Sequence, residues 1–286
     1  MSRILLAAVA AASLAAVVSS HSELLAQQDN AAASGLQYPL GAVRAEDGTT
    51  FIVDRKLPGV LKLAEGNLSV LVQGSKRFRE PLNAPRCIAL DKDGKVLVGD
   101  SSTREVYRID DSGKATALTG GGIGIPMSIA VNADGDLFVA DLELHRIFKV
   151  PAAGGKPEEF ATIAAPRGVA FDKDGNLFVL STTDDQVFKL TPEGKATVVV
   201  PGRPFQFPHN IAVSADGTVF VTDGYGKCVW KIAGKAAPEK LVSGEPFSNP
   251  VGLSLSGETL LVVDSRANAV FECDLNGKLT KIAPAR

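Results

Sequence analysis

Pro208-His-Asn-Ile-Ala-Val-Ser-Ala-Asp-Gly-Thr-Val-Phe-Val-Thr-Asp223 is one of six copies of a single pattern in this chain. Each copy has a proline, an apolar segment, a turn and a second apolar segment, and five of the six end in Asp. The copies begin at Pro39, Pro85, Pro126, Pro166, Pro208 and Pro250, which are 46, 41, 40, 42 and 42 residues apart. A period near 40 residues with four short apolar runs is typical of a β-propeller blade. The sequence therefore predicts an all-β fold, a six-bladed propeller with four strands in each blade.

The turn of each repeat carries a glycine. Asp134-Gly135 recurs as Asp47-Gly48, Asp93-Gly94, Asp174-Gly175 and Asp216-Gly217, and the last repeat has Ser256-Gly257-Glu258 instead. We expect two-residue hairpin turns, because glycine tolerates the positive φ that these turns need.

The ends of the repeat array predict how the ring closes. The last apolar run, 278–282, is the fourth strand of the sixth repeat, so blades 6 and 1 should pack together without exchanging a strand. Phe78, Phe205 and Phe247 precede the prolines of blades 2, 5 and 6. We expect these rings to cover the blade edges, with stacking on a ligand as the alternative.

The N-terminal residues differ from the rest of the chain. Arg3 precedes an apolar, Ala-rich stretch of 15 residues at 4–18, which is typical of a secretory signal peptide. A membrane-spanning helix needs about 20 residues. We therefore expect a signal peptide and leader at 1–26, a disordered linker at 27–35 and the propeller at 36–286. This predicts a periplasmic or secreted protein, with an uncleaved N-terminal anchor as the alternative.

Charge and cysteine usage restrict the partners further. The chain has 30 Lys and Arg against 32 Asp and Glu, so it lacks the positive surplus that binding to nucleic acid requires. Cys87, Cys228 and Cys273 lie in three different repeats, among apolar neighbours. We expect buried thiols and no disulfide.

The repeats resemble NHL repeats, most closely at Pro166-Arg-Gly-Val-Ala-Phe-Asp-Lys-Asp-Gly-Asn-Leu-Phe-Val and at the segment quoted first. The resemblance extends from about Leu36 to the end of the chain. It implies a six-bladed NHL-type propeller. Such propellers serve as extracellular sensor domains, as protein-binding platforms and in a few cases as enzymes, so the resemblance alone does not assign a function.

Two enzyme families with similar propellers can be compared residue by residue. Pro208-His209 and Asp223-Gly224-Tyr225 look similar to segments of the peptidyl-hydroxyglycine lyase, in which histidines hold zinc. Only one Pro-His occurs here, however, and the remaining histidines are His21 and His145. A zinc site with three histidines therefore cannot be assembled.

The SMP-30/gluconolactonase propellers are the second comparison. Residues 249–254 (Asn-Pro-Val-Gly-Leu-Ser) and 263–265 (Val-Asp-Ser) resemble segments of that family, which holds a divalent cation at the axis. Val251 stands where a ligating Asn is expected, and no Glu heads the first blade. A metal-dependent hydrolase of this kind is an alternative reading.

Aligning the six repeats gives two columns of residues near one rim of the channel. The first column follows each proline: Leu40, Arg86, Met127, Arg167, His209 and Val251. Arg86, Arg167 and His209 could converge on an anionic group, because guanidinium groups suit carboxylate and phosphate. The alternative is that these side chains only line the channel or pair with acids of the second column.

The second column ends the second strand of each blade: Asp54, Asp100, Asp141, Ser181, Asp223 and Asp264. A ring of carboxylates suits a hard cation. If a metal is present, we expect Asp100, Asp141, Asp223 and His209 to hold it. The alternative is that each Asp accepts backbone N–H groups of the neighbouring turn, which its recurrence in every blade but one favours.

Together these features predict an exported propeller that binds a protein or a small anionic ligand at the channel rim. We expect the binding residues to be Arg86, Arg167, His209, Asn210, Asp223 and Tyr225. We expect no cofactor and a monomer, and no catalytic residue is assigned. The alternative is a metal-dependent hydrolase or lyase with Ca²⁺ or Zn²⁺ at the axis.

Overall fold

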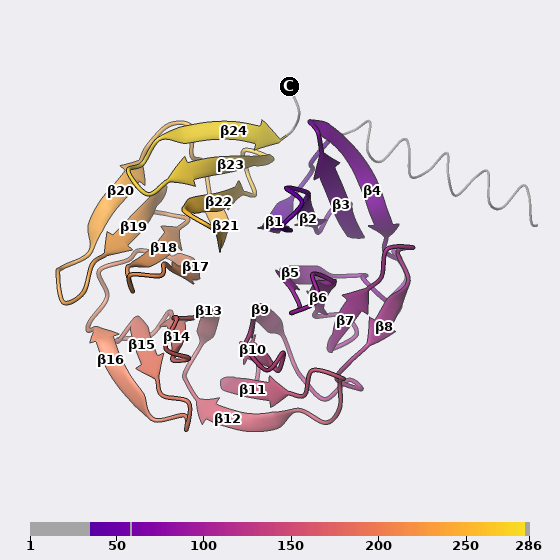
Figure 1. Ribbon diagram of the computed structural model, residues 1–286, viewed down its shortest axis with the longest axis horizontal. Coiled ribbons are helices and arrows are strands. Elements are labelled where there is room, and N and C mark those ends of the chain that lie inside the picture. The colour runs from indigo at the N-terminus through magenta and orange to yellow at the C-terminus, as the bar shows by residue number, and fades with distance from the viewer. Residues whose placement is uncertain (1–34, 58, 284–286) are drawn as a thin grey trace, which may run out of the picture.

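Each repeat folds into one antiparallel sheet of four strands that are consecutive in sequence. The structure is a computed structural model that describes residues 35–57 and 59–283. Its six sheets surround a central axis as the blades of a propeller (Figure 1). The predicted fold class and blade number are therefore confirmed. The predicted signal peptide at 1–26, and all but the last residue of the predicted linker at 27–35, lie outside the described residues.

The strands of blades 1 to 3 are β1 (Pro39–Arg44), β2 (Thr50–Asp54), β3 (Gly59–Ala64), β4 (Asn67–Gln73), β5 (Pro85–Leu90), β6 (Val96–Asp100), β7 (Glu105–Ile109), β8 (Ala115–Ala117), β9 (Pro126–Val131), β10 (Leu137–Asp141), β11 (Arg146–Val150) and β12 (Glu158–Thr162). Those of blades 4 to 6 are β13 (Pro166–Phe171), β14 (Leu177–Ser181), β15 (Val187–Leu190), β16 (Ala196–Val200), β17 (Pro208–Val213), β18 (Val219–Asp223), β19 (Cys228–Ile232), β20 (Glu239–Ser243), β21 (Pro250–Ser256), β22 (Thr259–Asp264), β23 (Ala269–Asp274) and β24 (Leu279–Ala283). The first strand of each blade lies nearest the axis and the fourth lies outermost (Figure 1).

A β-bulge at the start of every first strand directs one side chain out of the regular alternation. The proline that opens the strand pairs with the last residue of the second strand, as Pro208 does with Asp223. The next pair joins Asn210 to Thr222, so His209 is the extra residue. The same shift occurs in the other five blades. Since a bulge re-aims its extra residue, the whole first column is displaced in the same way.

The turns between first and second strands are one residue longer than predicted in blades 1 to 5, whereas blade 6 has the predicted two-residue turn, since Ser256 pairs with Thr259. In blade 3, the Gly135 N–H donates to the Asn132 carbonyl, and the Asn132 N–H donates to the Asp136 carbonyl. These bonds enclose three residues rather than two. Gly135 has a φ of 91°, as a type I turn closed by a left-handed residue requires. The glycine was identified for the correct reason, but the turn type was wrong.

The apolar core is divided into six clusters, one between each pair of neighbouring blades. The cluster that closes the ring joins Ile52 and Leu61 of blade 1 to Leu261 and Val270 of blade 6. Polar contacts also cross the same interface, among them the Arg44–Glu272 ion pair and a hydrogen bond from Ser254 Oγ to the Ala42 carbonyl. The predicted closure without strand exchange is confirmed.

The aromatic side chains before three of the prolines do not behave alike. Phe205 and Phe247 are buried in the clusters of the neighbouring blades, as predicted. Phe78, by contrast, is 76% exposed. It therefore covers no blade edge, and for this residue the prediction was wrong.

All three cysteines are buried and unpaired, as predicted. Burial raises the pKa of the Cys87 thiol to about 12, so this group is uncharged at neutral pH. The described residues include no helix of the length and hydropathy needed to cross a membrane.

Candidate functional site

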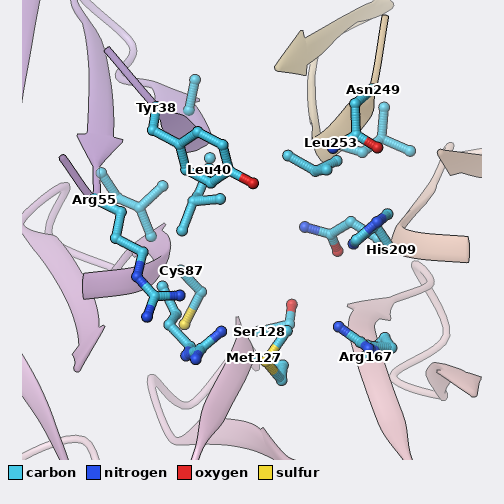
Figure 2. A pocket seen from close by; sticks show the side chains of 16 residues that line it. Tyr38, Leu40, Arg55, Cys87, Met127, Ser128, Arg167, His209, Asn249 and Leu253 are labelled. Carbon is cyan, nitrogen blue, oxygen red and sulfur yellow. The ribbon is translucent and has the colours of Figure 1, made fainter. Parts of the chain in front are cut away.

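The bulge residues of all six blades line one cavity of about 160 Å³ at one end of the channel. They are Leu40, Arg86, Met127, Arg167, His209 and Val251. Tyr38, Arg55, Ser128, Asn210 and Asn249 complete most of its polar lining. In Figure 2 the side chains of Arg55, Arg167 and His209 approach the same central space from different blades.

Three guanidinium groups give this cavity its charge. Arg55, Arg86 and Arg167 line it, and no Asp or Glu of the described residues does. Within residues 35–57 and 59–283, none of the three forms an ion pair. Burial, followed by repulsion from Arg55 and Arg167, lowers the pKa of the Arg86 guanidinium. The buried Asp100 carboxylate acts in the opposite direction as a smaller effect, so the cavity is a cluster of positive charge that the described chain offsets only in part.

Arg86 and Arg167 are held in different ways. Arg86 Nε donates to Ser101 Oγ at 3.0 Å, which fixes the guanidinium above the end of β6. Arg167 Nε is buried and has no hydrogen-bond partner among the described residues, and the guanidinium carbon lies 5.1 Å from the centre of the Phe207 ring. Burial lowers the pKa of Arg167 as well. A buried polar atom without a partner is uncommon, which marks Arg167 as a site where a further acceptor fits.

His209 is an uncharged imidazole at neutral pH. Burial and, to a smaller extent, repulsion from Arg167 lower its pKa to about 4, although Asp223 acts in the opposite direction. Its Nε2 is buried and has no hydrogen-bond partner in the described structure. The site therefore places a neutral nitrogen base beside a permanent positive charge.

Of the other predicted binding residues, Asn210 lines the cavity and Asp223 and Tyr225 do not. The Asn210 side-chain oxygen accepts the Ile211 N–H at 2.9 Å. Tyr225 is 63% exposed and its ring stacks on Phe207 at 4.8 Å. The structure thus brings together Arg86, Arg167, His209 and Asn210, and places Tyr225 one ring away.

Asp223 serves the backbone. Its two carboxylate oxygens accept the N–H groups of Gln206, Phe207 and Gly226 at 2.8 to 3.0 Å, and Trp230 Nε1 at 3.2 Å. It thereby joins the segment that enters the blade to the turn that follows its second strand. We call this arrangement the aspartate clasp.

The clasp recurs in four other blades. Asp54, Asp141 and Asp264 each accept two N–H groups from the residues before the blade's proline and two from the following turn. Asp100 accepts one from each, and its Oδ2 is left without a partner. All five are fully buried. The alternative reading of the second column, acceptance of backbone N–H groups, is the one that the structure supports.

These contacts decide whether the predicted cation ligands fit a metal. Asp100, Asp141 and Asp223 lie in three different blades, each bonded to its own loop, and His209 lies among guanidinium groups. In the part of the chain that the structure describes, no three His, Cys, Asp or Glu side chains are grouped so that they could hold a metal ion. The four residues that were predicted to hold a metal are therefore not grouped around one point, and they do not fit a divalent cation.

Blade 4 replaces the clasp by a different set of bonds. Ser181 Oγ still accepts a turn N–H, that of Thr183 at 3.0 Å, but toward the segment before Pro166 it donates, to the Ala164 carbonyl at 2.8 Å. The Ala165 N–H, which precedes Pro166, donates to His145 Nδ1 of the neighbouring blade at 2.8 Å. The deviation of this repeat and the isolated histidine thus have one structural explanation.

Sequence reasoning missed Arg55, Tyr38 and Asn249 as cavity residues. Arg55 directly follows the aspartate of the second column, and Tyr38 and Asn249 directly precede prolines of the first. The signal was their position next to the two columns. Extending each column by one residue would have included all three.

The fold is similar to several solved structures. The virginiamycin B lyase from Staphylococcus aureus superimposes with a TM-score of 0.65 at 16% identity, over 86% of each chain. A gluconolactonase from Xanthomonas campestris has a TM-score of 0.70 at 16% identity, over 86% of this chain and 87% of that one. A chain of the nidogen/laminin complex has a TM-score of 0.67 at 18% identity, over 77% and 87%. At these identities the similarity concerns the fold, and the predicted resemblance to gluconolactonase propellers is confirmed at that level.

The sequence itself carries a more specific relationship. No curated protein matches it significantly. Residues 75–284, which include five of the six prolines and the cavity residues Arg86, Arg167 and His209, match the virginiamycin B lyase family. The chain therefore belongs to the virginiamycin B lyase family.

Proposed function

We propose that this protein binds a small anionic molecule in the rim cavity. The observation that carries the proposal is the group of three guanidinium side chains, Arg55, Arg86 and Arg167, in a cavity lined by no carboxylate. The signal peptide predicted at 1–26 would place this binding in the periplasm or outside the cell.

Electrostatics favours an anionic ligand. Partly buried charges without a counter-charge are unfavourable, and burial already lowers the pKa of Arg86 and Arg167. A carboxylate or phosphate would accept charge-assisted hydrogen bonds from the guanidinium groups. The cavity volume of about 160 Å³ is smaller than that of pockets for drug-sized molecules, which supports a small ligand or one that enters with its anionic end only.

Isothermal titration with inorganic phosphate and with acetate tests this proposal. We expect measurable binding, and a loss of about tenfold or more in affinity for Arg167→Gln, because a hydrogen bond to a charged group is removed. Arg104→Gln is the matched control, since Arg104 is half exposed, paired with Glu143 and outside the cavity. Equal affinities for the two variants would contradict the proposal.

A second candidate is elimination chemistry with His209 as general base. The observation that favours it is a buried, neutral imidazole beside guanidinium groups, a combination of proton acceptor and anion stabiliser. The imidazole would take a proton from the carbon next to a carbonyl. The electrons of that C–H bond would form a C=C bond as the leaving group departs, and Arg167 would stabilise the negative charge on the carbonyl oxygen.

A relative supports this second candidate. A virginiamycin B lyase from Staphylococcus aureus in which one histidine is replaced by alanine is catalytically inactive, and its structure was solved with quinupristin. Mass spectrometry of quinupristin incubated with this protein tests the candidate. Elimination adds no water to the products and hydrolysis adds one. Conversion by wild type that disappears in His209→Ala would support it, and no conversion, or equal conversion by both, would rule it out.

A further inference from the structure

A short aromatic stack leads out of the cavity wall. Phe207 lies under the Arg167 guanidinium at 5.1 Å and meets the His209 ring edge to face at 4.7 Å. Phe207 also stacks on Tyr225, with ring centroids 4.8 Å apart and planes at 20°. Since Arg167 and His209 both line the cavity, Tyr225 is connected to two cavity residues through the single ring of Phe207.

Tyr225 leaves most of its surface open to solvent. It is 63% exposed, although large apolar rings are usually buried. The other large apolar side chains exposed in the described part of the chain are Phe78, Leu144 and Val198. Only Tyr225 among these four stacks on a residue that contacts the cavity wall. Its exposure therefore coincides with the approach to the site.

The aspartate clasp of blade 5 fixes the backbone that carries both rings of the stack. Asp223 accepts the Phe207 N–H at 2.9 Å and the Gly226 N–H at 3.0 Å. The Gly224 N–H donates to the Phe207 carbonyl at 3.1 Å. The backbone on either side of Tyr225 is thus tied to the backbone of Phe207. With its backbone tied down and one face already stacked on Phe207, the Tyr225 ring loses less conformational freedom than a free side chain when a ligand stacks on it.

We infer that the ligand carries a planar, conjugated ring in addition to its anionic group. The anionic group enters the cavity between Arg86 and Arg167, and the ring stacks on Tyr225 at the rim. This inference rests on the proposed anion binding and adds the chemical class of the ligand. Phe207 links the two parts, because it contacts both Arg167 and Tyr225.

Two carboxylates that differ only in their ring test the inference. 3-Phenylpropionate and 3-cyclohexylpropionate have the same charge and chain, but only the first has a planar π-system. By isothermal titration of the purified protein, we expect 3-phenylpropionate to bind about two- to tenfold more tightly, as aromatic pairing predicts.

Three variants assign the preference to one side chain. Tyr225→Ala should remove it and Tyr225→Phe should keep it, because the ring rather than the hydroxyl is required. Phe78→Ala is the matched control, since Phe78 is also an exposed ring and its ring contact is with Arg79 rather than Phe207. Thermal melting shows whether Tyr225→Ala is still folded.

Acetate separates this inference from the proposal on which it rests. If acetate binds but the two ring acids bind with equal affinity, the inference that the ligand carries a planar ring is wrong and the proposal of anion binding is unaffected. The same holds if Tyr225→Ala still prefers 3-phenylpropionate. If neither acetate nor the ring acids bind, anion binding itself fails and the inference fails with it. A preference that is present in wild type and Phe78→Ala, and absent in Tyr225→Ala, supports the inference.

Discussion

The backbone of Gly224 packs directly against the imidazole of His209. A Cβ atom at Gly224 would lie 3.0 Å from both Nε2 and Cδ2 of His209, and 2.5 Å from Oδ1 of Asn249. Glycine is needed at position 224 because His209 and Asn249, two cavity side chains, occupy the space that a Cβ atom would fill. The wall of the cavity is thus set partly by the absence of a side chain.

Gly224→Ala should displace His209 and Asn249. We expect a loss of about 1 to 3 kcal/mol in the free energy of unfolding, as for other overpacked sites, together with weaker phosphate binding. Urea unfolding and titration calorimetry measure the two effects. Repeating the substitution in a His209→Ala background provides the control, because removing the imidazole relieves part of the overlap. An identical loss of unfolding free energy in both backgrounds would mean that His209 does not clash with a side chain at position 224.

Stability should rise with pH through the range in which His209 titrates. Its pKa is about 4 in the folded protein, against an ordinary 6.5, so the unfolded chain binds more protons between these values. The contribution is fully present above pH 6.5 and is lost as pH falls toward 4, by up to about 3 kcal/mol. Urea unfolding between pH 4 and 7, without added anions, measures it. His209→Asn should show a shallower pH dependence, and an unchanged slope would contradict the assignment to His209.

Asp141→Ala should destabilise the protein strongly. Asp141 accepts the N–H groups of Gly124, Ile125, Glu143 and Leu144, so its removal leaves four N–H donors without this acceptor, the first two of them in buried or half-buried residues. We expect a loss of about 3 kcal/mol or more. Asp134→Ala is the control, because Asp134 is exposed in the hairpin turn of the same blade and should change stability by less than about 0.5 kcal/mol. Similar effects of the two substitutions would show that the hydrogen bonds of the Asp141 carboxylate do not stabilise the protein.

Ser181→Asp should destabilise the protein although it restores the residue found in the other five blades. Substitution toward a repeat consensus usually stabilises. Here Ser181 Oγ donates to the Ala164 carbonyl, and a carboxylate cannot donate, so a buried charge would face a carbonyl oxygen. We expect a loss of at least about 1 kcal/mol relative to wild type in thermal or urea unfolding. A gain in stability would instead mean that the loop before Pro166 can turn its N–H groups toward the carboxylate.

The repeat made the fold predictable because its signals are local. Proline, alternating apolar residues, glycine turns and terminal aspartates each act within one blade, and together they specified blade number, closure and the clasp. Turn length was mispredicted in blade 3 because the same Asp-Gly pair is compatible with two hairpin types, which differ in the hydrogen bonds of Asn132 and Asp136.

The cavity was only partly predictable because it depends on how separate blades meet. The first column was found by aligning repeats, but the bulge that aims His209 at the axis leaves no mark in the sequence. Arg55 has no equivalent in the other blades, where Ser101, Leu142, Thr182, Gly224 and Ser265 follow the second column. An alignment of repeats identifies residues that recur, so it does not identify Arg55, which occurs in one blade.

The interface between blades 6 and 1 has a consequence for the order of the blades along the chain. It is built as the other five interfaces are, from an apolar cluster between first strands and their neighbours, and none of the described strands crosses it. The ring therefore has no privileged starting blade. A circular permutant that joins β24 to β1 through a short linker and opens between any other two blades, for example between β12 and β13, should reach the same architecture and the same rim. The architecture requires only the order of the blades around the ring, and the chain termini can lie between any two of them.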